Sequence, residues 1–289
     1  MQTDQKHFIF RLGEFVKFSH TIFALPFALI SAMVACGGRI PLRLFGLVLV
    51  CMAAARTGAM CFNRLADWEI DQQNPRTSGR HRLIKKEQGW AVMAVSLVVF
   101  FFATWNINPL CFYLSPLMVA VILSYSLMKR FTAVPHLFLG LALGLAPMGA
   151  WAAVTGELYS AKPYMLAASV VCWTFGFDLI YATLDVESDR KAGLLSFPAK
   201  YGIPAALRLA RILHYIAFAG FLAFGWMARL GGLYAVACLV VVAGLFQEHR
   251  YAKQVDTAAI NKAFFHSNAL VSISLLAGVF LDLCLKKIF

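Results

Sequence analysis

The chain has 289 residues, of which 61% are hydrophobic and only 14% are charged, against about 25% charged residues in a typical soluble domain. The mean hydropathy is +0.71, and these values together exclude a soluble globular protein. The net charge of +12 lies in segments between long apolar runs. It therefore suits anionic lipids and a polyanionic substrate, and we expect no nucleic-acid partner.

Nine apolar runs are long enough to cross a membrane or nearly so, and they predict an all-α integral membrane protein. They cover residues 18–36, 44–62, 90–106, 109–128, 136–155, 162–184, 212–228, 231–246 and 267–285. The runs are continuously apolar rather than alternating, which excludes a transmembrane β-barrel. Several are shorter than the roughly 20 residues of a full span, so we expect polar flanks to extend the helices. The whole chain, 1–289, is predicted to form one membrane domain.

Basic residues are distributed unevenly between the two sides of the predicted bundle. The segment before the first run is polar and lacks an apolar stretch followed by a small-residue cleavage site, so we expect no cleaved signal peptide. With the amino terminus inside, 19 of the 26 Lys and Arg residues flank the inner side and six flank the outer side. The positive-inside rule then predicts an odd number of spans, a multi-pass protein of the bacterial inner membrane, and a cytoplasmic amino terminus.

Five of the eight aspartates fall in two short windows at the ends of apolar runs. In the first window, Asn63, Asp67 and Asp71 follow one another at intervals of four residues. Because an α-helix turns by about 100° per residue, each step drifts by only about 40°, and the three side chains form one stripe. Arg76 follows five residues after the last aspartate.

The second window begins at Asp178, and Asp185 and Asp189 follow after seven and then four more residues. These intervals bring the three carboxylates back to within about 20° of one direction on a helix. Tyr181 lies one turn after the first aspartate, and Lys191 follows the last one. Both windows come after spans that run toward the inside, so we expect them to converge at the cytoplasmic surface.

Facing carboxylates need a cation between them to stay ionised. Two unit charges about 4 Å apart repel by roughly 4 kcal/mol at an effective dielectric of 20. A set of oxygen ligands favours magnesium over zinc or copper, and magnesium retains waters and bridges carboxylates to phosphates. The two windows therefore predict a magnesium site that holds a phosphorylated substrate at a membrane surface.

The two windows also resemble the motifs of a known family. The patterns N-R-x-x-D-x-x-x-D-x-x-x-x-R-T at 63–77 and D-x-x-Y-x-x-x-D-x-x-x-D-x-x-x-G at 178–193 are similar to those of the UbiA superfamily of intramembrane prenyltransferases. Segments 18–26 and 125–132 resemble the family's first helix and the end of its fourth, so the likeness covers nearly the whole chain. Many members have Asn-Asp where this chain has Asn63-Arg64.

The resemblance implies nine transmembrane helices around a central cavity that opens to the cytoplasmic side and laterally to lipid. There Mg²⁺ would hold a polyprenyl diphosphate, and the polyprenyl group would pass to an aromatic acceptor, with 4-hydroxybenzoate and ubiquinone biosynthesis as the first choice. The implied metal ligands are Asp67, Asp71, Asp185 and Asp189, with Asn63 and Asp178 as candidate direct or water-mediated ligands. The implied diphosphate-binding residues are Arg76, Lys129, Arg130 and Lys191, with Tyr181 as a further contact.

Two more roles concern the acceptor. Arg56 lies inside an apolar run, seven residues before Asn63 and on the same helical face. A charged residue within a span is costly and commonly functional, so we expect Arg56 to bind the acceptor's carboxylate as a bidentate partner or to pair with an aspartate of the windows. Asp178 is the candidate for removing a proton from the phenol.

Alternative functions remain open at this stage. Within the same family, the acceptor could be a dihydroxynaphthoate of menaquinone biosynthesis, and haem farnesylation, chlorophyll prenylation and archaeal lipid synthesis have less support. From another class, intramembrane carboxylates could serve a cation-coupled transporter. A transporter would place its acids near the middle of the membrane, whereas these lie beside basic loops at the ends of the runs. We expect a monomer in the lipid bilayer.

Overall fold

The computed structural model describes residues 7–17, 21, 23–74, 76–253 and 257–286, and these residues form helices and connecting turns without a strand. The α-helices are α1 (Phe8–Phe15), α2 (Leu25–Ala35), α3 (Leu42–Ala66), α4 (Trp68–Gln73), α5 (Lys86–Ile107), α6 (Pro109–Met128), α7 (Pro135–Thr155), α8 (Ala161–Ala182), α9 (Val186–Lys191), α10 (Phe197–Tyr201), α11 (Ile203–Met227), α12 (Gly232–Ala252) and α13 (Thr257–Leu285). Short 3-10 turns lie at Arg80–Arg82 and Thr183–Asp185.

The all-α membrane architecture predicted from the sequence is confirmed. Within the described ranges, eight helices are long and apolar enough to cross a membrane: α3, α5, α6, α7, α8, α11, α12 and α13. The remaining predicted run, 18–36, is the first in the chain and contains the shorter apolar helix α2. Its residues 18–20 and 22 lie outside the described part. Polar flanks extend the helices as expected, since α11 begins at Ile203 although its apolar run begins at 212.

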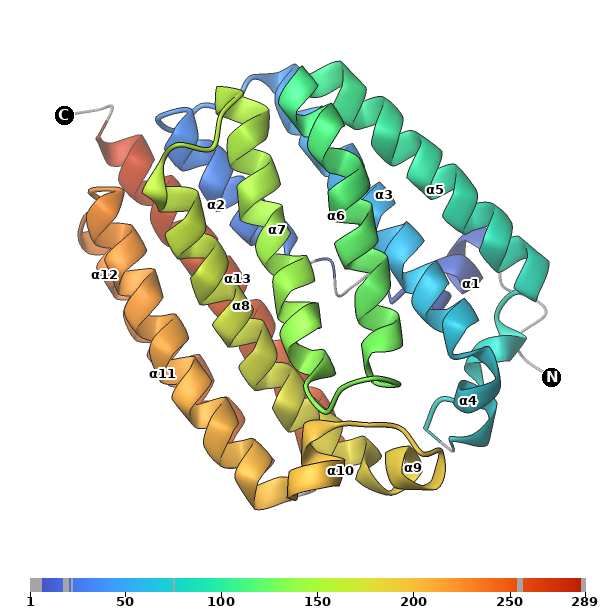
Figure 1. The fold of residues 1–289 in the computed structure, drawn as a ribbon. Helices are drawn as coiled ribbons and strands as arrows, with labels where there is room; N and C mark the ends of the chain where they lie inside the picture. Colours follow the sequence, from blue (N-terminus) through green and yellow to red (C-terminus); the bar gives the residue numbers. More distant parts are fainter. Residues whose placement is uncertain (1–6, 18–20, 22, 75, 254–256, 287–289) are drawn as a thin grey trace.

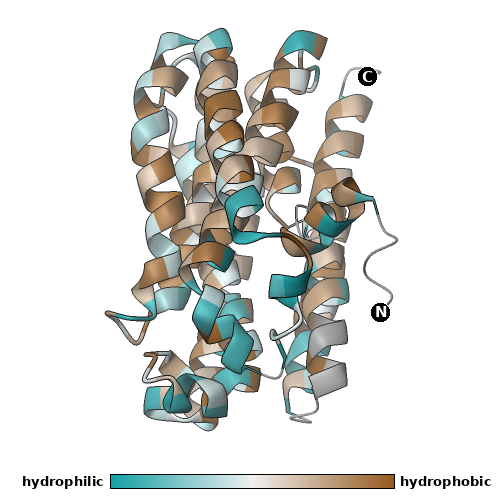
Figure 2. Ribbon diagram, turned by 90° about the vertical axis from the view of Figure 1, so that its right-hand side faces the viewer, coloured by the Kyte–Doolittle hydropathy of each residue, from teal (hydrophilic) through white to brown (hydrophobic). Residues whose placement is uncertain are grey.

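Long helices that follow one another in the chain run in opposite directions and form one bundle, with α4, α9 and α10 gathered at one end (Figure 1). We call this the aspartate end, because Asp67 and Asp185 lie there at the ends of α3 and α8. The long helices are mostly hydrophobic, and strongly hydrophilic segments are concentrated toward this same end (Figure 2). Many polar residues therefore lie where the two aspartate windows meet.

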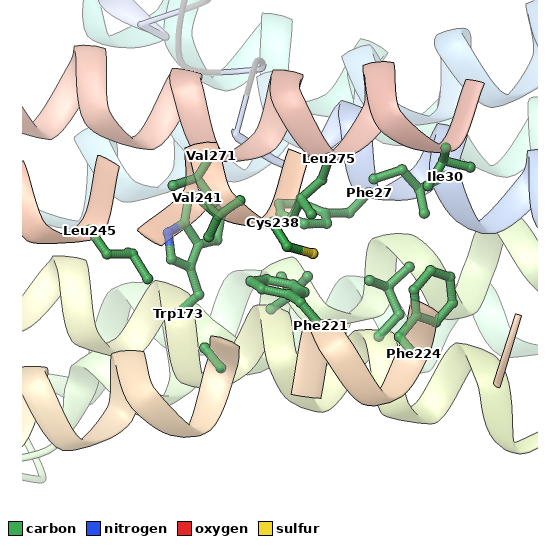
Figure 3. Close-up of a cluster of buried hydrophobic side chains, with 14 of the residues drawn as sticks. Phe27, Ile30, Trp173, Phe221, Phe224, Cys238, Val241, Leu245, Val271 and Leu275 are labelled. Carbon is green, nitrogen blue, oxygen red and sulfur yellow. The ribbon is translucent and has the colours of Figure 1, made fainter. Parts of the chain in front are cut away.

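One side of the bundle is a closely packed apolar core. It is formed by α2, α8, α11, α12 and α13, and its centre is aromatic (Figure 3). The ring of Phe27 stacks on that of Phe221 at 5.8 Å between centroids and contacts that of Trp173 at 5.2 Å. All three side chains are fully buried. This core holds α8 in place from behind, so that its other face can line the site.

Close packing of α7 against α8 depends on two glycines. A Cβ atom at Gly140 would lie 2.7 Å from the carbonyl oxygen of Val171, and one at Gly144 would lie 2.8 Å from the Val171 side chain and 3.2 Å from the carbonyl oxygen of Ala167. Such small-residue pairs, four residues apart, let membrane helices approach closely. We call this contact the α7–α8 seam, and it fixes the distance and register between the two helices.

The helical stripes predicted for the aspartate windows are each interrupted at the middle aspartate. Asp67 joins α3 to α4 with φ −100° and ψ 13°, and Asp185 joins the 3-10 turn to α9 with φ −106° and ψ 3°. These values belong to a sparsely populated backbone region where many active-site residues lie. Aspartate also competes with the backbone for hydrogen bonds, so it is a poor residue for a helix interior. The four-residue spacing alone predicts continuous helices, and the structure differs from that prediction at these two residues.

Candidate active site

A cavity of about 910 Å³ opens among α3, α6, α7 and α8. Both aspartate windows line it, as does almost every site residue predicted from the sequence. The predicted residues in its wall are Arg56, Asn63, Asp67, Asp71, Arg76, Lys129, Asp178, Tyr181, Asp185, Asp189 and Lys191. Arg130 is not part of the wall but lies behind it, with its guanidinium group 3.6 Å from Asp67.

The first window is surrounded by cations. Asp67 is 4% exposed, and the Nζ atom of Lys129 lies 2.5 Å from its Oδ2 atom. Asp71 accepts hydrogen bonds from Arg80 at 3.1 and 3.2 Å, and Arg64 lies 3.6 Å from its carboxylate. Charge-assisted hydrogen bonds of this kind are shorter and stronger than those between neutral groups. The same cations could bind an anionic ligand in the cavity.

The second window is joined directly to the first by Arg76. This residue lies in the loop after α4, and its guanidinium group pairs with both carboxylate oxygens of Asp185. It also donates to the Tyr181 hydroxyl at 2.6 Å and lies over that ring. Asn74 donates to the same aspartate at 3.2 Å. Segments more than a hundred residues apart in the chain therefore converge on one site.

Two basic residues of the cavity wall have pKa values that are shifted by their surroundings. Burial lowers the pKa of Arg76, but its hydrogen bond to Asp185 and its contact with Tyr181 outweigh this effect and raise the pKa overall. Lys17 also lines the cavity, and burial together with the nearby guanidinium group of Arg80 lowers its pKa. An anion in the cavity would relieve the repulsion between these cations.

Arg56 lies deeper in the wall than the aspartates. Its guanidinium group donates to the carbonyl oxygen of Lys17 at 3.3 Å, and its Nε atom is buried without a partner among the described residues. No described aspartate forms an ion pair with it, so the structure does not contain the pairing with a window aspartate that we considered from the sequence. Its remaining donors are available to a ligand.

Sequence reasoning did not identify several polar residues of the wall. These residues are Arg64, Asn74, Arg80 and His136. Arg80 could not be distinguished in the sequence from the ordinary basic residues of an inner loop. His136 carried a weak signal, because it lies four residues before Gly140 and so shares the helical face of the α7–α8 seam. The structure pairs its Nδ1 atom with Asp178 Oδ2 at 2.6 Å.

The ligand chemistry of the wall fits magnesium. Within the described ranges, no three His, Cys, Asp or Glu side chains lie close enough to hold a metal ion by themselves. Magnesium does not need such a cage, because it typically uses one or two carboxylates, several waters and substrate phosphates. The Oδ1 atom of Asp67 is buried and accepts no hydrogen bond from the described residues, so an oxygen ligand is available at the first window.

Comparisons with known proteins agree with this architecture. The profile of the UbiA prenyltransferase family matches residues 24–269. The 4-hydroxybenzoate solanesyltransferase of Synechocystis sp. (strain ATCC 27184 / PCC 6803 / Kazusa) is 30% identical over 266 residues, which cover 88% of each chain. The 4-hydroxybenzoate octaprenyltransferase of Pseudomonas putida (strain GB-1) is 29% identical over 284 residues, or 94% of each chain.

Solved structures share the fold. The apo structure of a UbiA homologue from Aeropyrum pernix K1 matches with a TM-score of 0.82 at 31% identity, covering 91% of this chain and 98% of that one. A UbiA homologue from Archaeoglobus fulgidus, bound to GPP and Mg²⁺, has a TM-score of 0.67 at 18% identity and covers 93% and 99% of the two chains. That second likeness is one of fold. Because the family profile matches most of the sequence, the chain belongs to the UbiA prenyltransferase family.

Proposed function

We propose that this protein transfers a polyprenyl group from a polyprenyl diphosphate to 4-hydroxybenzoate, with Mg²⁺ as cofactor, in ubiquinone biosynthesis. The observation that carries the proposal is the convergence of the two aspartate windows, joined by the Arg76–Asp185 pair, at one end of a mostly apolar cavity. Relatives named as 4-hydroxybenzoate polyprenyltransferases support the choice of acceptor. Acids at the ends of the helices, rather than at mid-depth, favour an enzyme over a cation-coupled transporter.

The aspartate end would bind the diphosphate. Metal ligands would come from Asn63, Asp67 and Asp71 in the first window and from Asp185 and Asp189 in the second. Bound magnesium would neutralise the diphosphate and so assist breakage of the C–O bond.

The protein's own cations would share this task. Arg76 and Lys129 are now paired with window aspartates, and they would turn toward phosphate oxygens. Lys191, also in the wall, and Arg130, behind it, are further candidates. Preorganised positive groups that act where negative charge develops commonly supply a large share of catalysis.

The rest of the cavity would hold the polyprenyl chain away from water. Along α7 its wall runs from His136 to Ala153, about 25 Å at 1.5 Å per residue, which is close to the roughly 30 Å thickness of a bilayer core. The lining there is dominated by Ala, Leu and Met side chains. An apolar wall excludes water from a reactive allylic cation, and we expect long chains to extend sideways into lipid.

The acceptor would lie between the aspartate end and the apolar depth. Arg56 would bind its carboxylate through the donors that the described residues leave free, since an arginine matches a carboxylate in bidentate geometry. The membrane assignment then follows the charge distribution: we propose a monomer in the bacterial inner membrane, with the amino terminus and the aspartate end on the cytoplasmic side.

An acceptor panel tests the proposal. Membranes containing the protein would be incubated with prenyl diphosphates of several lengths, Mg²⁺ and either 4-hydroxybenzoate or a dihydroxynaphthoate, and products would be identified by mass spectrometry. We expect a prenylated 4-hydroxybenzoate that disappears when Mg²⁺ is chelated. Product from the dihydroxynaphthoate alone would assign the protein to menaquinone biosynthesis instead, and no product from any aromatic acceptor would contradict the proposal.

A further inference from the structure

The cavity wall contains a histidine–aspartate pair whose purpose the diphosphate site does not explain. The Nδ1 atom of His136, on α7, lies 2.6 Å from Oδ2 of Asp178, on α8. Both residues line the cavity, and the histidine is only 3% exposed. We assign Nδ1 as the donor of this hydrogen bond, because a protonated ring nitrogen can donate to a carboxylate oxygen.

The packing of the bundle holds this pair in one geometry. His136, Gly140 and Gly144 follow one another at intervals of four residues, so the imidazole lies on the helical face that forms the α7–α8 seam. The imidazole ring also stacks on Phe175 with an interplanar angle of 17°. The orientation of the Asp178 carboxylate is therefore set by rigid helices rather than by a loop.

Asp178 differs from the other window aspartates in its partner and its depth. Asp67, Asp71 and Asp185 pair with Lys or Arg side chains, whereas Asp178 pairs with an imidazole. It lies seven residues before Asp185, or about 10 Å further into the bundle at 1.5 Å per residue. Asp178 therefore lies deeper in the bundle than the aspartate end, toward the depth at which the acceptor would bind.

The local polar groups support a role at that level. Tyr125 and Arg56 line the same cavity as Asp178. Arg56 is our proposed ligand for the acceptor's carboxylate. The wall thus offers a cation for one end of a hydroxylated aromatic acid and a carboxylate for another part of it.

Both members of the pair have unused polar capacity. The Asp178 side chain is 23% exposed, and no described residue donates a hydrogen bond to its Oδ1 atom, which leaves an acceptor facing the cavity. The Nε2 atom of His136 is buried with no partner in the described part of the chain. Leaving a buried polar atom unpaired costs about 1–3 kcal/mol, and each such atom in a native structure calls for an explanation.

We propose that His136 positions Asp178 to recognise the hydroxyl group of the aromatic acceptor. The imidazole donates to Oδ2, and the acceptor's hydroxyl group donates to Oδ1, so this pair sets the specificity for a hydroxylated ring. The inference rests on the proposed function and deepens it. A site built to hydrogen-bond a substrate hydroxyl group discriminates strongly against an analogue that lacks it.

The test compares the KM of the substrate 4-hydroxybenzoate with the inhibition constant of benzoate. Benzoate lacks the hydroxyl group and serves as a competitive inhibitor. Wild type, His136→Leu and His136→Gln would be assayed as full-length protein in membranes. Loss of the positioning hydrogen bond in His136→Leu should raise the KM for 4-hydroxybenzoate by about tenfold or more. Neither the benzoate inhibition constant nor the KM for the prenyl diphosphate should change by more than about twofold, because neither ligand uses the pair.

His136→Gln is the matched variant, because its amide can still donate to Asp178 without a titrating group. It should restore most of the acceptor affinity lost in His136→Leu. An unchanged acceptor KM in His136→Leu, or an equal rise in the benzoate inhibition constant, would overturn the inference. If His136→Leu does not accumulate in membranes, Asp178→Asn would be tested in its place. It should raise the KM for 4-hydroxybenzoate and leave the benzoate inhibition constant unchanged. An unchanged KM, or an equal rise in the benzoate inhibition constant, would overturn the inference.

The outcome is distinguishable from a failure of the proposed function. If wild type prenylates no aromatic acceptor, the function itself is wrong. If wild type prenylates 4-hydroxybenzoate and His136→Leu keeps the wild-type preference over benzoate, only the role of this pair is wrong.

Discussion

The two sides of the bundle are both built from apolar helices, but their interiors are filled differently. On one side, α2, α8, α11, α12 and α13 close around large rings such as Trp173 and Phe221. On the other, α3, α6 and α7 contribute smaller or flexible residues, among them Ala55, Ala59 and Met118, and a cavity remains. Dense packing resists deformation, so the closed side can serve as a rigid support for the open one.

Helix α8 belongs to both sides. Its residues Trp173 and Phe177 pack into the aromatic core, while Asp178 and Tyr181 line the cavity. Hydropathy alone cannot distinguish these two faces, because the span is apolar throughout except at its end. The comparison therefore predicts two separable classes of variant: those of the cavity should change catalysis, and those of the core should change stability.

The largest expected effect is on catalysis at the aspartate end. Replacing Asp185 by Asn should lower turnover by about 1000-fold, because one ligand and one preorganised charge at the leaving group are lost. Asp67→Asn should behave alike. Product would be measured by mass spectrometry, and thermal unfolding in detergent would serve as the control for folding. Near-normal rates in both variants would refute the ligand assignment.

The core should show the converse behaviour. Phe221→Ala removes a fully buried ring that stacks on Phe27, which should reduce the free energy of unfolding by about 3 kcal/mol. The KM values of both substrates should stay unchanged in the folded fraction. A variant of normal stability with impaired acceptor binding would show that core and cavity are not separable.

A smaller effect is expected at Arg56. Its replacement by Ala should raise the KM for 4-hydroxybenzoate and the inhibition constant of benzoate together by about tenfold, the value of one lost charged hydrogen bond. The KM of the prenyl diphosphate should not change. The joint rise separates Arg56 from His136, whose loss should affect only the hydroxylated ligand. If acceptor binding were intact but little protein accumulated, Arg56 would have a structural role.

The smallest effect should come from Arg80. Its replacement by Ala removes one of two cations near Asp71, and Arg64 remains 3.6 Å away, so the KM for the prenyl diphosphate should rise only about threefold. Arg82→Ala is the matched control, because this nearby arginine is exposed and not part of the cavity wall. Equal effects of the two substitutions would indicate a general influence of loop charge.

Much of this organisation could be predicted from the sequence. Long apolar runs fix the spans because a membrane leaves backbone groups no partner outside the helix, and the four-residue spacing of Asn63, Asp67 and Asp71 placed these side chains together. The breaks at Asp67 and Asp185 could not be predicted, because they depend on how each chain turns at the end of the bundle.

The residues that pair with the aspartates could not be predicted from the sequence either. Arg80 is one of several basic residues in its loop, and only the tertiary fold shows which of them reaches Asp71. His136 pairs with a residue 42 positions away, at a distance set by glycines whose role is visible only when α7 and α8 are packed. The assignments of individual metal, diphosphate and acceptor ligands remain predictions for the variants above.

The breaks at the two middle aspartates have an electrostatic consequence. Because α3 ends at Ala66 and α8 ends at Ala182, the carbonyl ends of two long helices point toward the same site. A helix carries the equivalent of about half a negative charge at this end. Main-chain dipoles thus add an attraction for cations that no side-chain replacement can remove. We therefore expect weak residual metal affinity even in a variant in which all the window aspartates are replaced.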